Sequence, residues 1–134
     1  MRRQRFPSAP ASAGDARRFV ASVLTAAGLE HLTYTASMLV SELVANAILH
    51  TGTPLVVVIA PDDDRVRIEV HDGSTQLPVR KHYSSMSGTG RGLLLVQRMA
   101  SEWGSDRATD GKVVWFELDV EGVPTIDILG ADAI

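Results

Sequence analysis

Three polar residues in one predicted helix have the spacing of a single functional stripe. Glu42, Asn46 and His50 recur at every fourth position, so they share one side of a helix predicted over residues 33–50. A solvated polar face would give the same spacing. However, asparagine is unfavourable inside a helix because its amide competes for backbone hydrogen bonds, and most of this helix is apolar. A buried Glu and Asn need partners, and their oxygens suit a hydrated magnesium ion.

An acidic residue ends a predicted strand on the apolar side of that strand. By alternation, Asp72 shares its face with Val66, Ile68 and Val70 in the segment 65–72. Two interpretations stay open at this point. Asp-Gly-Ser over residues 72–74 is good turn chemistry. Alternatively, the carboxylate lies at the edge of the core and accepts a hydrogen bond from a buried ligand donor, such as an amino group on a purine ring.

A glycine-rich loop leads into a third predicted helix. Glycines at 88, 90 and 92 would let the backbone approach a phosphate closely, and the free N–H groups of a helix N-terminus attract anions. Arg91 could add a cation. The sequence is not a Walker loop, because Gly-Lys-Ser/Thr is absent. It is not a dinucleotide fingerprint either, because a long polar segment, rather than a strand, precedes it.

Composition excludes several other kinds of site. The 134-residue chain has no cysteine, which excludes disulfides, zinc–thiolate sites, iron–sulfur clusters and a cysteine nucleophile. A net charge of −3 and a pI near 5.7 argue against a protein that coats nucleic acid. We find no run of 18 apolar residues, so we expect no membrane span. The basic start lacks the apolar region of a signal peptide, and we expect a cytoplasmic protein.

The predicted elements that must position these residues make up one domain. Residues 1–12 are expected to be extended, as an edge strand or an arm, and residues 1–120 form the domain. Residues 121–134 form a tail with no clear period. Helices are predicted over residues 15–27, 33–50 and 92–100, and strands over 55–60, 65–72, 103–108 and 113–120. This order predicts an α+β two-layer sandwich, with helices on one face of a mostly antiparallel sheet.

Taken in order, these motifs resemble those of the Bergerat-fold ATP-binding domain shared by gyrase and the histidine kinases. The N-box is matched by residues 42–47, the adenine-reading segment by residues 72–74 and the second glycine box by residues 88–92. The details of residues 41–47 and 114–118 look most like the anti-sigma-factor serine kinases of bacteria. The resemblance covers roughly residues 5–120.

The resemblance implies a role for each matched residue. Asn46 would bind the magnesium ion that bridges the phosphates of ATP, and Glu42 would be the catalytic general base. Asp72 would accept a hydrogen bond from the adenine amino group, and residues 75–87 would form the lid. The implied nucleotide-binding residues are Asn46, Asp72, Ser74, Gly88, Thr89, Gly90, Arg91, Gly92 and Leu93.

Two positions depart from the family pattern. Ser74 stands where the family has a glycine, so a side chain lies where bare backbone usually approaches adenine. Gly111 is followed by Lys112, where the family often has a threonine hydroxyl that holds adenine through water. Both departures bear on nucleotide affinity and leave the proposed phosphate and metal residues unchanged.

The resemblance leads to three hypotheses about function. The first is an ATP- and magnesium-dependent serine kinase that phosphorylates a STAS-type anti-anti-sigma protein and also sequesters a sigma factor. The second is a nucleotide-dependent interaction module without significant catalysis. The third is a partner-binding domain that has lost its nucleotide. We expect no direct contact with nucleic acid or membrane. A homodimer stays open, since relatives of this kind commonly dimerise.

Overall fold

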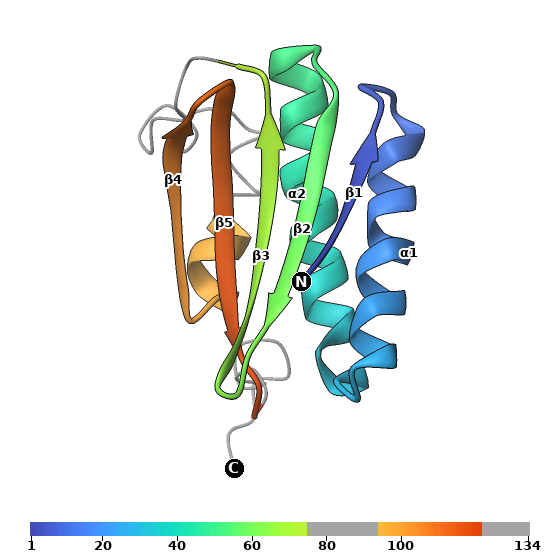
Figure 1. The fold of residues 1–134 in the computed structure, drawn as a ribbon, viewed down its shortest axis with the longest axis vertical. Coiled ribbons are helices and arrows are strands. Elements are labelled where there is room, and N and C mark those ends of the chain that lie inside the picture. The colour runs from blue at the N-terminus through green and yellow to red at the C-terminus, as the bar shows by residue number, and fades with distance from the viewer. Residues whose placement is uncertain (75–93, 122–134) are drawn as a thin grey trace.

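The computed structural model describes residues 1–74 and 94–121, and the predictions made for residues 75–93 and 122–134 lie outside them. The described residues form two layers, a sheet and a set of helices (Figure 1). The elements in chain order are β1 (Arg2–Phe6), α1 (Ala11–Ala26), the short 3₁₀ helix η1 (Glu30–Leu32), α2 (Thr33–Thr51), β2 (Leu55–Pro61), β3 (Arg65–Asp72), a helical stretch over residues 94–99, β4 (Glu102–Ala108) and β5 (Gly111–Asp119).

The sheet has five strands in the order β1-β2-β3-β5-β4, and every neighbouring pair is antiparallel. Strands that are consecutive in the sequence form the hairpins β2–β3 and β4–β5, close to the predicted strands over 55–60 and 65–72 and over 103–108 and 113–120. Strand β4 follows β3 in the sequence, but β5 lies between them in the sheet. The predicted α+β sandwich is confirmed, and the extended N-terminal segment is an edge strand.

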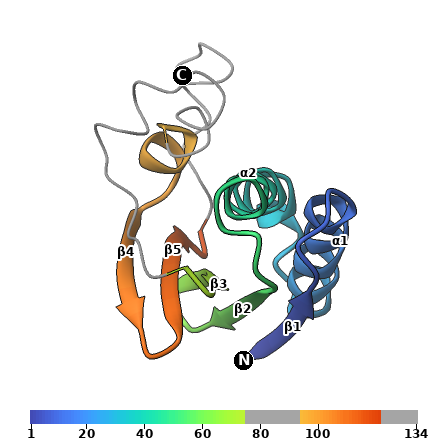
Figure 2. The ribbon, with the colours of Figure 1, turned by 90° about the horizontal axis from the view of Figure 1, so that it is seen from above.

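All the helices cover the same face of the sheet (Figure 2). Alternation explains this, because every second residue of β3 is buried, from Val66 to Asp72, and the residues between are half-buried. The buried face of the sheet packs on the buried sides of α1 and α2. The largest fully buried side chains of the core between the layers include Phe116, Ile68 and Ile59 from the sheet and Leu24 and Leu39 from the helices. Burial of this continuous apolar layer drives the two layers together.

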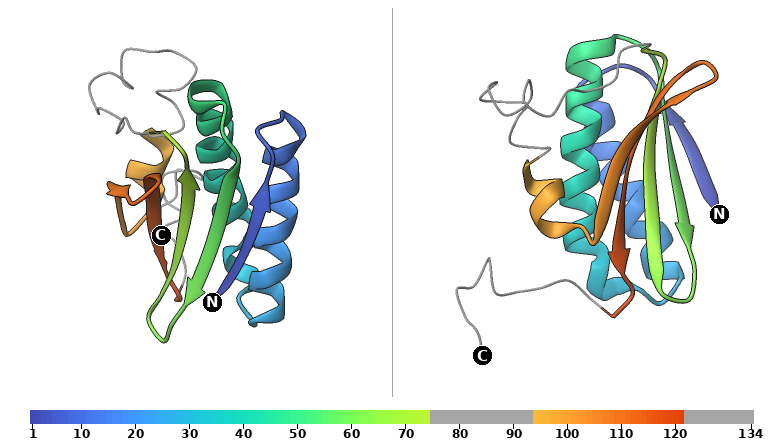
Figure 3. Two further views of the ribbon diagram at one scale, coloured as in Figure 1. Left: turned by 45° about the horizontal axis from the view of Figure 1, so that its top comes forward. Right: turned by 90° about the vertical axis from the view of Figure 1, so that its left-hand side faces the viewer.

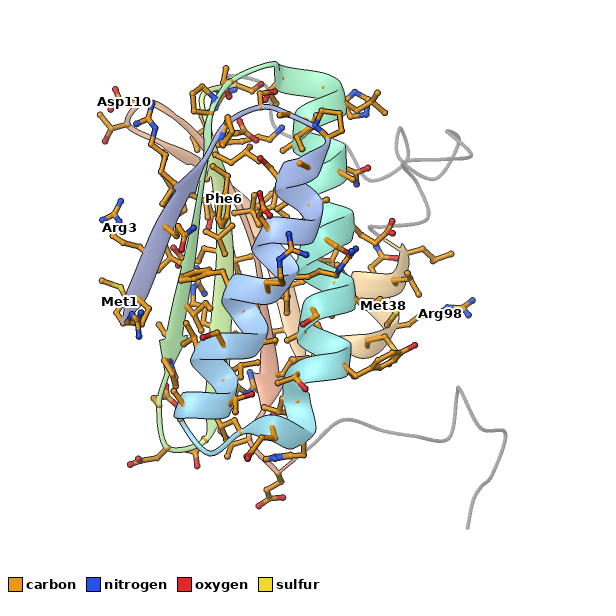
Figure 4. The ribbon with its side chains drawn as sticks, turned by 90° about the vertical axis from the view of Figure 1, so that its right-hand side faces the viewer. Met1, Arg3, Phe6, Met38, Arg98 and Asp110 are labelled. Carbon is orange, nitrogen blue, oxygen red and sulfur yellow. The ribbon has the colours of Figure 1, made fainter. Side chains whose placement is uncertain are left out.

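The N-terminal strand is held against α1 by an aromatic contact. Phe6 is 3% exposed and lies between the sheet and α1 (Figure 4). Its ring meets that of Phe19 edge to face, with ring centroids 6.1 Å apart. Helix α1 begins at Ala11, four residues earlier than the sequence suggested. Pro10 at its N-cap has φ −56°, an angle that already suits a helix.

Helix α2 is the central helix of the fold. The segment Glu30–Thr51 is long and apolar enough to cross a membrane by length and composition, with a mean hydropathy of 1.3. Half of the 18-residue stretch with this hydropathy is buried inside the protein. Packing in the core therefore accounts for the apolar character of the helix. The helix ends at Gly52, whose φ of 67° is left-handed and therefore favours glycine.

The opposite face of the sheet carries a network of charged side chains. Arg65 pairs with Glu117, Asp119 and Glu102. Arg67 lies over the ring of Trp115, 4.0 Å from its centroid, and pairs with Glu69. Burial raises the pKa of Glu69, but the hydrogen bonds from Arg67 and His71 outweigh it and leave the pKa below its usual value.

The lowered pKa of Glu69 predicts an acid-dependent contribution to stability. A carboxyl group with a depressed pKa stabilises the fold above its unfolded pKa of about 4.3, and this contribution is lost as the pH falls through the folded pKa. The Glu69→Gln variant lacks the contribution at every pH. Urea unfolding between about pH 6 and pH 3 should therefore show a difference between the two proteins that shrinks with acid. A difference independent of pH would contradict this account.

Two glycine substitutions should have opposite effects on stability. A Cβ at Gly111 would lie 1.8 Å from the backbone oxygen of Asp72, so Gly111→Ala must push two paired strands apart. A Cβ at Gly14, inside α1, meets only ordinary contacts at 3.5 Å or more. We expect Gly111→Ala to cost about 3 kcal/mol or more and Gly14→Ala to gain about 0.5–1 kcal/mol. Denaturant unfolding of both variants measures the two values. Equal effects would refute the strand contact.

Candidate functional site

The candidate site lies where the last turn of α2 meets the end of β3 and the start of β5, at the top of Figure 1. A short chain of hydrogen bonds fixes this end of the fold. The Thr51 hydroxyl accepts from the backbone N–H of Thr53 at 3.2 Å, and the Thr53 hydroxyl accepts from the backbone N–H of Gly73 at 2.8 Å. The loop after α2 is therefore tied directly to the residues that follow β3.

Asp72 is buried on the helix-facing side of the sheet, as its alternation predicted. Its side chain is only 1% exposed. One carboxylate oxygen, Oδ1, accepts the backbone N–H of Ser74 at 2.7 Å. This bond is the turn interaction considered from the sequence, so the two interpretations of Asp72 are compatible. The turn uses one oxygen, and Oδ2 lies toward the start of β5.

Lys112 is the partner of Asp72 across the sheet. The two residues are directly opposite in the antiparallel pairing of β3 with β5. The Lys112 side chain is 7% exposed, and its Nζ lies 3.7 Å from Oδ2 of Asp72. This separation is short enough for strong attraction at low dielectric but longer than a hydrogen bond. The sequence pattern indicates at Lys112 only the lack of a threonine hydroxyl, and it does not predict this ion pair.

Gly111 allows β5 to approach β3 closely at the end where Lys112 faces Asp72. The turn between β4 and β5 ends one residue before Gly111, so the strand starts earlier than predicted. No side chain fits at this position, because a Cβ would overlap the backbone of Asp72 and Gly73. The close approach brings Lys112 opposite Asp72 at the first pairs of the β3–β5 ladder. The signal in the sequence is a glycine two residues before the predicted strand over 113–120, in alternation with Val113 and Trp115.

The residues of the polar stripe on α2, Glu42, Asn46 and His50, differ in how far they are buried. Asn46 is 9% exposed, Glu42 is half-buried, and His50 is exposed near the end of the helix. The described structure records a polar or electrostatic interaction for both Asn46 and His50. Asn46 lies about 7 Å before the end of α2, at 1.5 Å per residue. Glu42 and Asn46 therefore lie in the buried or half-buried part of the helix, and His50 lies outside it.

The side of α2 that bears Asn46 faces away from α1. Ser37, nine residues earlier, hydrogen-bonds Arg17 of α1 at 3.5 Å, and nine residues correspond to a half-turn offset around a helix. Met38, one turn before Glu42, lies on the side where the helix over residues 94–99, with Arg98, is found (Figure 4). Glu42 and Asn46 therefore belong to the side of α2 that faces the helix over residues 94–99.

The helix over residues 94–99 completes the helical layer on that side of α2, as the views in Figure 3 show. Val96 and Met99 are buried in the common core. The backbone N–H of Ser101 donates to the Glu117 carbonyl at 2.8 Å and ties the end of this helix to β5. The preceding predicted site residues Gly88, Thr89, Gly90, Arg91, Gly92 and Leu93, together with the lid over 75–87, lie outside the described residues.

Within residues 1–74 and 94–121, no group of three or more His, Cys, Asp and Glu side chains is placed to hold a metal ion. The polar groups that the described site offers are the Asp72 carboxylate, the Lys112 ammonium, the Asn46 amide and the Glu42 carboxylate. This set combines hydrogen-bond acceptors and donors with oxygens suited to magnesium.

The buried ion pair should matter far more for stability than an exposed one. Asp72→Asn leaves the Lys112 ammonium buried without a counter-charge, and we expect a cost of about 3 kcal/mol. Removing the ammonium as well, in Asp72→Asn/Lys112→Met, should recover part of that loss. Asp15→Asn, in the exposed pair with Arg18, is the control and should cost less than about 0.5 kcal/mol. Chemical denaturation measures each variant. Additive losses would mean that the two side chains do not interact.

Comparisons with known proteins place this arrangement in a family. A search of curated proteins found no match. The family described as the histidine kinase-like ATPase domain matches residues 6–118, which is most of the chain. Its fold agrees with the five-stranded sheet and the single helical layer. The chain therefore belongs to the histidine kinase-like ATPase domain family, whose members bind ATP, typically with Mg²⁺.

Proposed function

We propose that this protein is an ATP- and magnesium-dependent serine kinase that phosphorylates a STAS-type anti-anti-sigma protein and also binds a sigma factor. The observation that carries the nucleotide part is Asp72, a carboxylate with a 1% exposed side chain at the end of the central strand β3. A buried carboxylate with one oxygen outside the local turn is suited to accept from an amino group on a base. Ser74 holds the other oxygen.

Asn46 and Glu42 supply the phosphate end of the proposed site. Magnesium that arrives on a nucleotide needs only one or two protein oxygens and keeps several waters, and the Asn46 amide would supply one oxygen. Glu42 lies one helical turn earlier on the same side of α2. Its half-buried carboxylate would accept the hydroxyl proton of the substrate serine. Gly88 to Leu93 would contribute backbone N–H groups to the phosphates.

The proposed reaction balances without a further reactant. The serine oxygen forms a bond to the γ-phosphorus of ATP, the bond from that phosphorus to the bridging oxygen breaks, and ADP leaves. The hydroxyl proton goes to Glu42. Phosphoryl transfer demands mainly positioning and charge neutralisation, and a rigid helix is a suitable support for Glu42 and Asn46.

The choice of partner rests on the likeness to anti-sigma-factor kinases at residues 41–47 and 114–118. In the fold, these segments lie in α2 and β5. The first carries the proposed base, and in the second Phe116 and Leu118 are fully buried. A kinase of this type works in the cytoplasm, and its regulatory output passes through docked proteins rather than through contact with nucleic acid.

Nucleotide binding should depend on magnesium through Asn46. We expect ATP with Mg²⁺ to raise the melting temperature of the wild type, by an amount that grows with ligand concentration. Asn46→Ala should lose most of the magnesium-dependent part of this shift, because it removes a metal ligand. Ser37→Ala, on the opposite side of the same helix, is the control and should keep the shift. If ATP and ADP leave the melting temperature of a folded sample unchanged, the chain has lost nucleotide binding.

Phosphoryl transfer should require Glu42. Mixed with γ-labelled ATP and a STAS-domain protein encoded beside its gene, the wild type should yield phosphoserine. Glu42→Gln should lower the transfer rate by about 10²-fold or more while ATP binding stays unchanged, because it removes only the general base. Glu30→Gln, an exposed change in η1, is the matched control. Nucleotide binding with no transfer to a cognate STAS protein would instead indicate a nucleotide-dependent interaction module.

A further inference from the structure

The two positions that depart from the family pattern meet at the same carboxylate. The backbone N–H of Ser74 donates to Oδ1 of Asp72 at 2.7 Å, and Nζ of Lys112 lies 3.7 Å from Oδ2. The carboxylate is thus held by the turn on one side and neutralised by a cation on the other. A ligand that reaches Asp72 must therefore also meet Lys112.

The geometry of the pair leaves hydrogen-bonding capacity on both side chains. At 3.7 Å, Nζ and Oδ2 attract each other but do not share a hydrogen bond. The structure pairs the Lys112 ammonium with the Asp72 carboxylate. An ammonium carries three donors, and an ion pair at 3.7 Å is too long to use one of them as a hydrogen bond. A ligand with an acceptor at this point could therefore accept a hydrogen bond from Lys112.

The pairing of β5 with β3 fixes the position of Lys112, in addition to the rotamer of its side chain. Lys112 and Asp72 are partners in the β3–β5 ladder, and Gly111 allows the strands to approach at that end. On β5, the alternation that buries Val114 and Phe116 also directs Lys112 to the helix-facing side. The acceptor and the donor therefore lie side by side on the same face of the sheet.

We propose that Lys112 is a specificity-determining residue that reads the nucleobase together with Asp72. The Asp72 carboxylate accepts from the exocyclic amino group, and the Lys112 ammonium donates to the ring nitrogen beside that group. Adenine presents this donor and acceptor on adjacent positions of one edge. The inference rests on the proposed nucleotide-binding function and adds the second half of the base contact.

Paired changes in protein and ligand test this assignment by calorimetric titration. Lys112→Met keeps a long unbranched side chain but has no donor, so it should weaken ATP binding about tenfold or more, as expected for a lost hydrogen bond to a charged group. An ATP analogue in which C–H replaces the ring nitrogen beside the amino group should bind the wild type more weakly by a similar factor. Lys112→Met should bind the analogue and ATP equally, because the interacting atoms are already absent.

The controls separate this inference from the proposed function. Arg107→Met, at the neighbouring β4 position that pairs with Lys112, removes a nearby cation and should keep the preference for ATP over the analogue. If Lys112→Met fails to fold by circular dichroism, the analogue comparison on the wild type decides alone. Equal binding of ATP and the analogue by the wild type would overturn the Lys112 contact and leave the proposed function intact. Failure of the wild type to bind ATP would overturn the proposed function itself.

Discussion

The site depends on the antiparallel pairing of β3 with β5, which sets Asp72 opposite Lys112. Both side chains are nearly excluded from water, so each charge would be costly without the other. The close approach that creates the pair needs a glycine at 111, because any Cβ there would strike the backbone of Asp72. The sheet therefore requires a particular backbone contact in order to hold one buried carboxylate in place.

The helical layer depends on the same sheet. The buried face of β3 supplies a surface on which α2 packs, and α2 in turn holds Asn46 and Glu42 on the side turned away from α1. Helix α2 is apolar on most of its circumference. It can hold two polar side chains at a buried edge only because its apolar sides pack against the rest of the core. Proposed chemistry and core packing thus involve the same helix, and a change in one will affect the other.

The opposite face of the sheet has a different character. Its charges are arranged in exposed or half-exposed pairs, with Arg67 over Trp115 and Arg65 among three acidic residues. Pairs of this kind contribute little individually because water screens them. The contrast with Asp72 and Lys112 follows from strand alternation, since neighbouring residues of one strand face water on one side and the core on the other.

The sequence by itself determined the order of the elements, the class of fold and the inward position of Asp72, because alternation and helical periodicity depend only on residues near in the chain. It also placed Glu42 and Asn46 on one stripe of a single helix. It did not determine that Lys112 pairs with Asp72, that α1 begins at Ala11, or that His50 lies outside the buried part of the stripe. These facts were decided by the tertiary structure. An ion pair between residues 40 positions apart depends on strand order and register, which come from the packing of the whole chain.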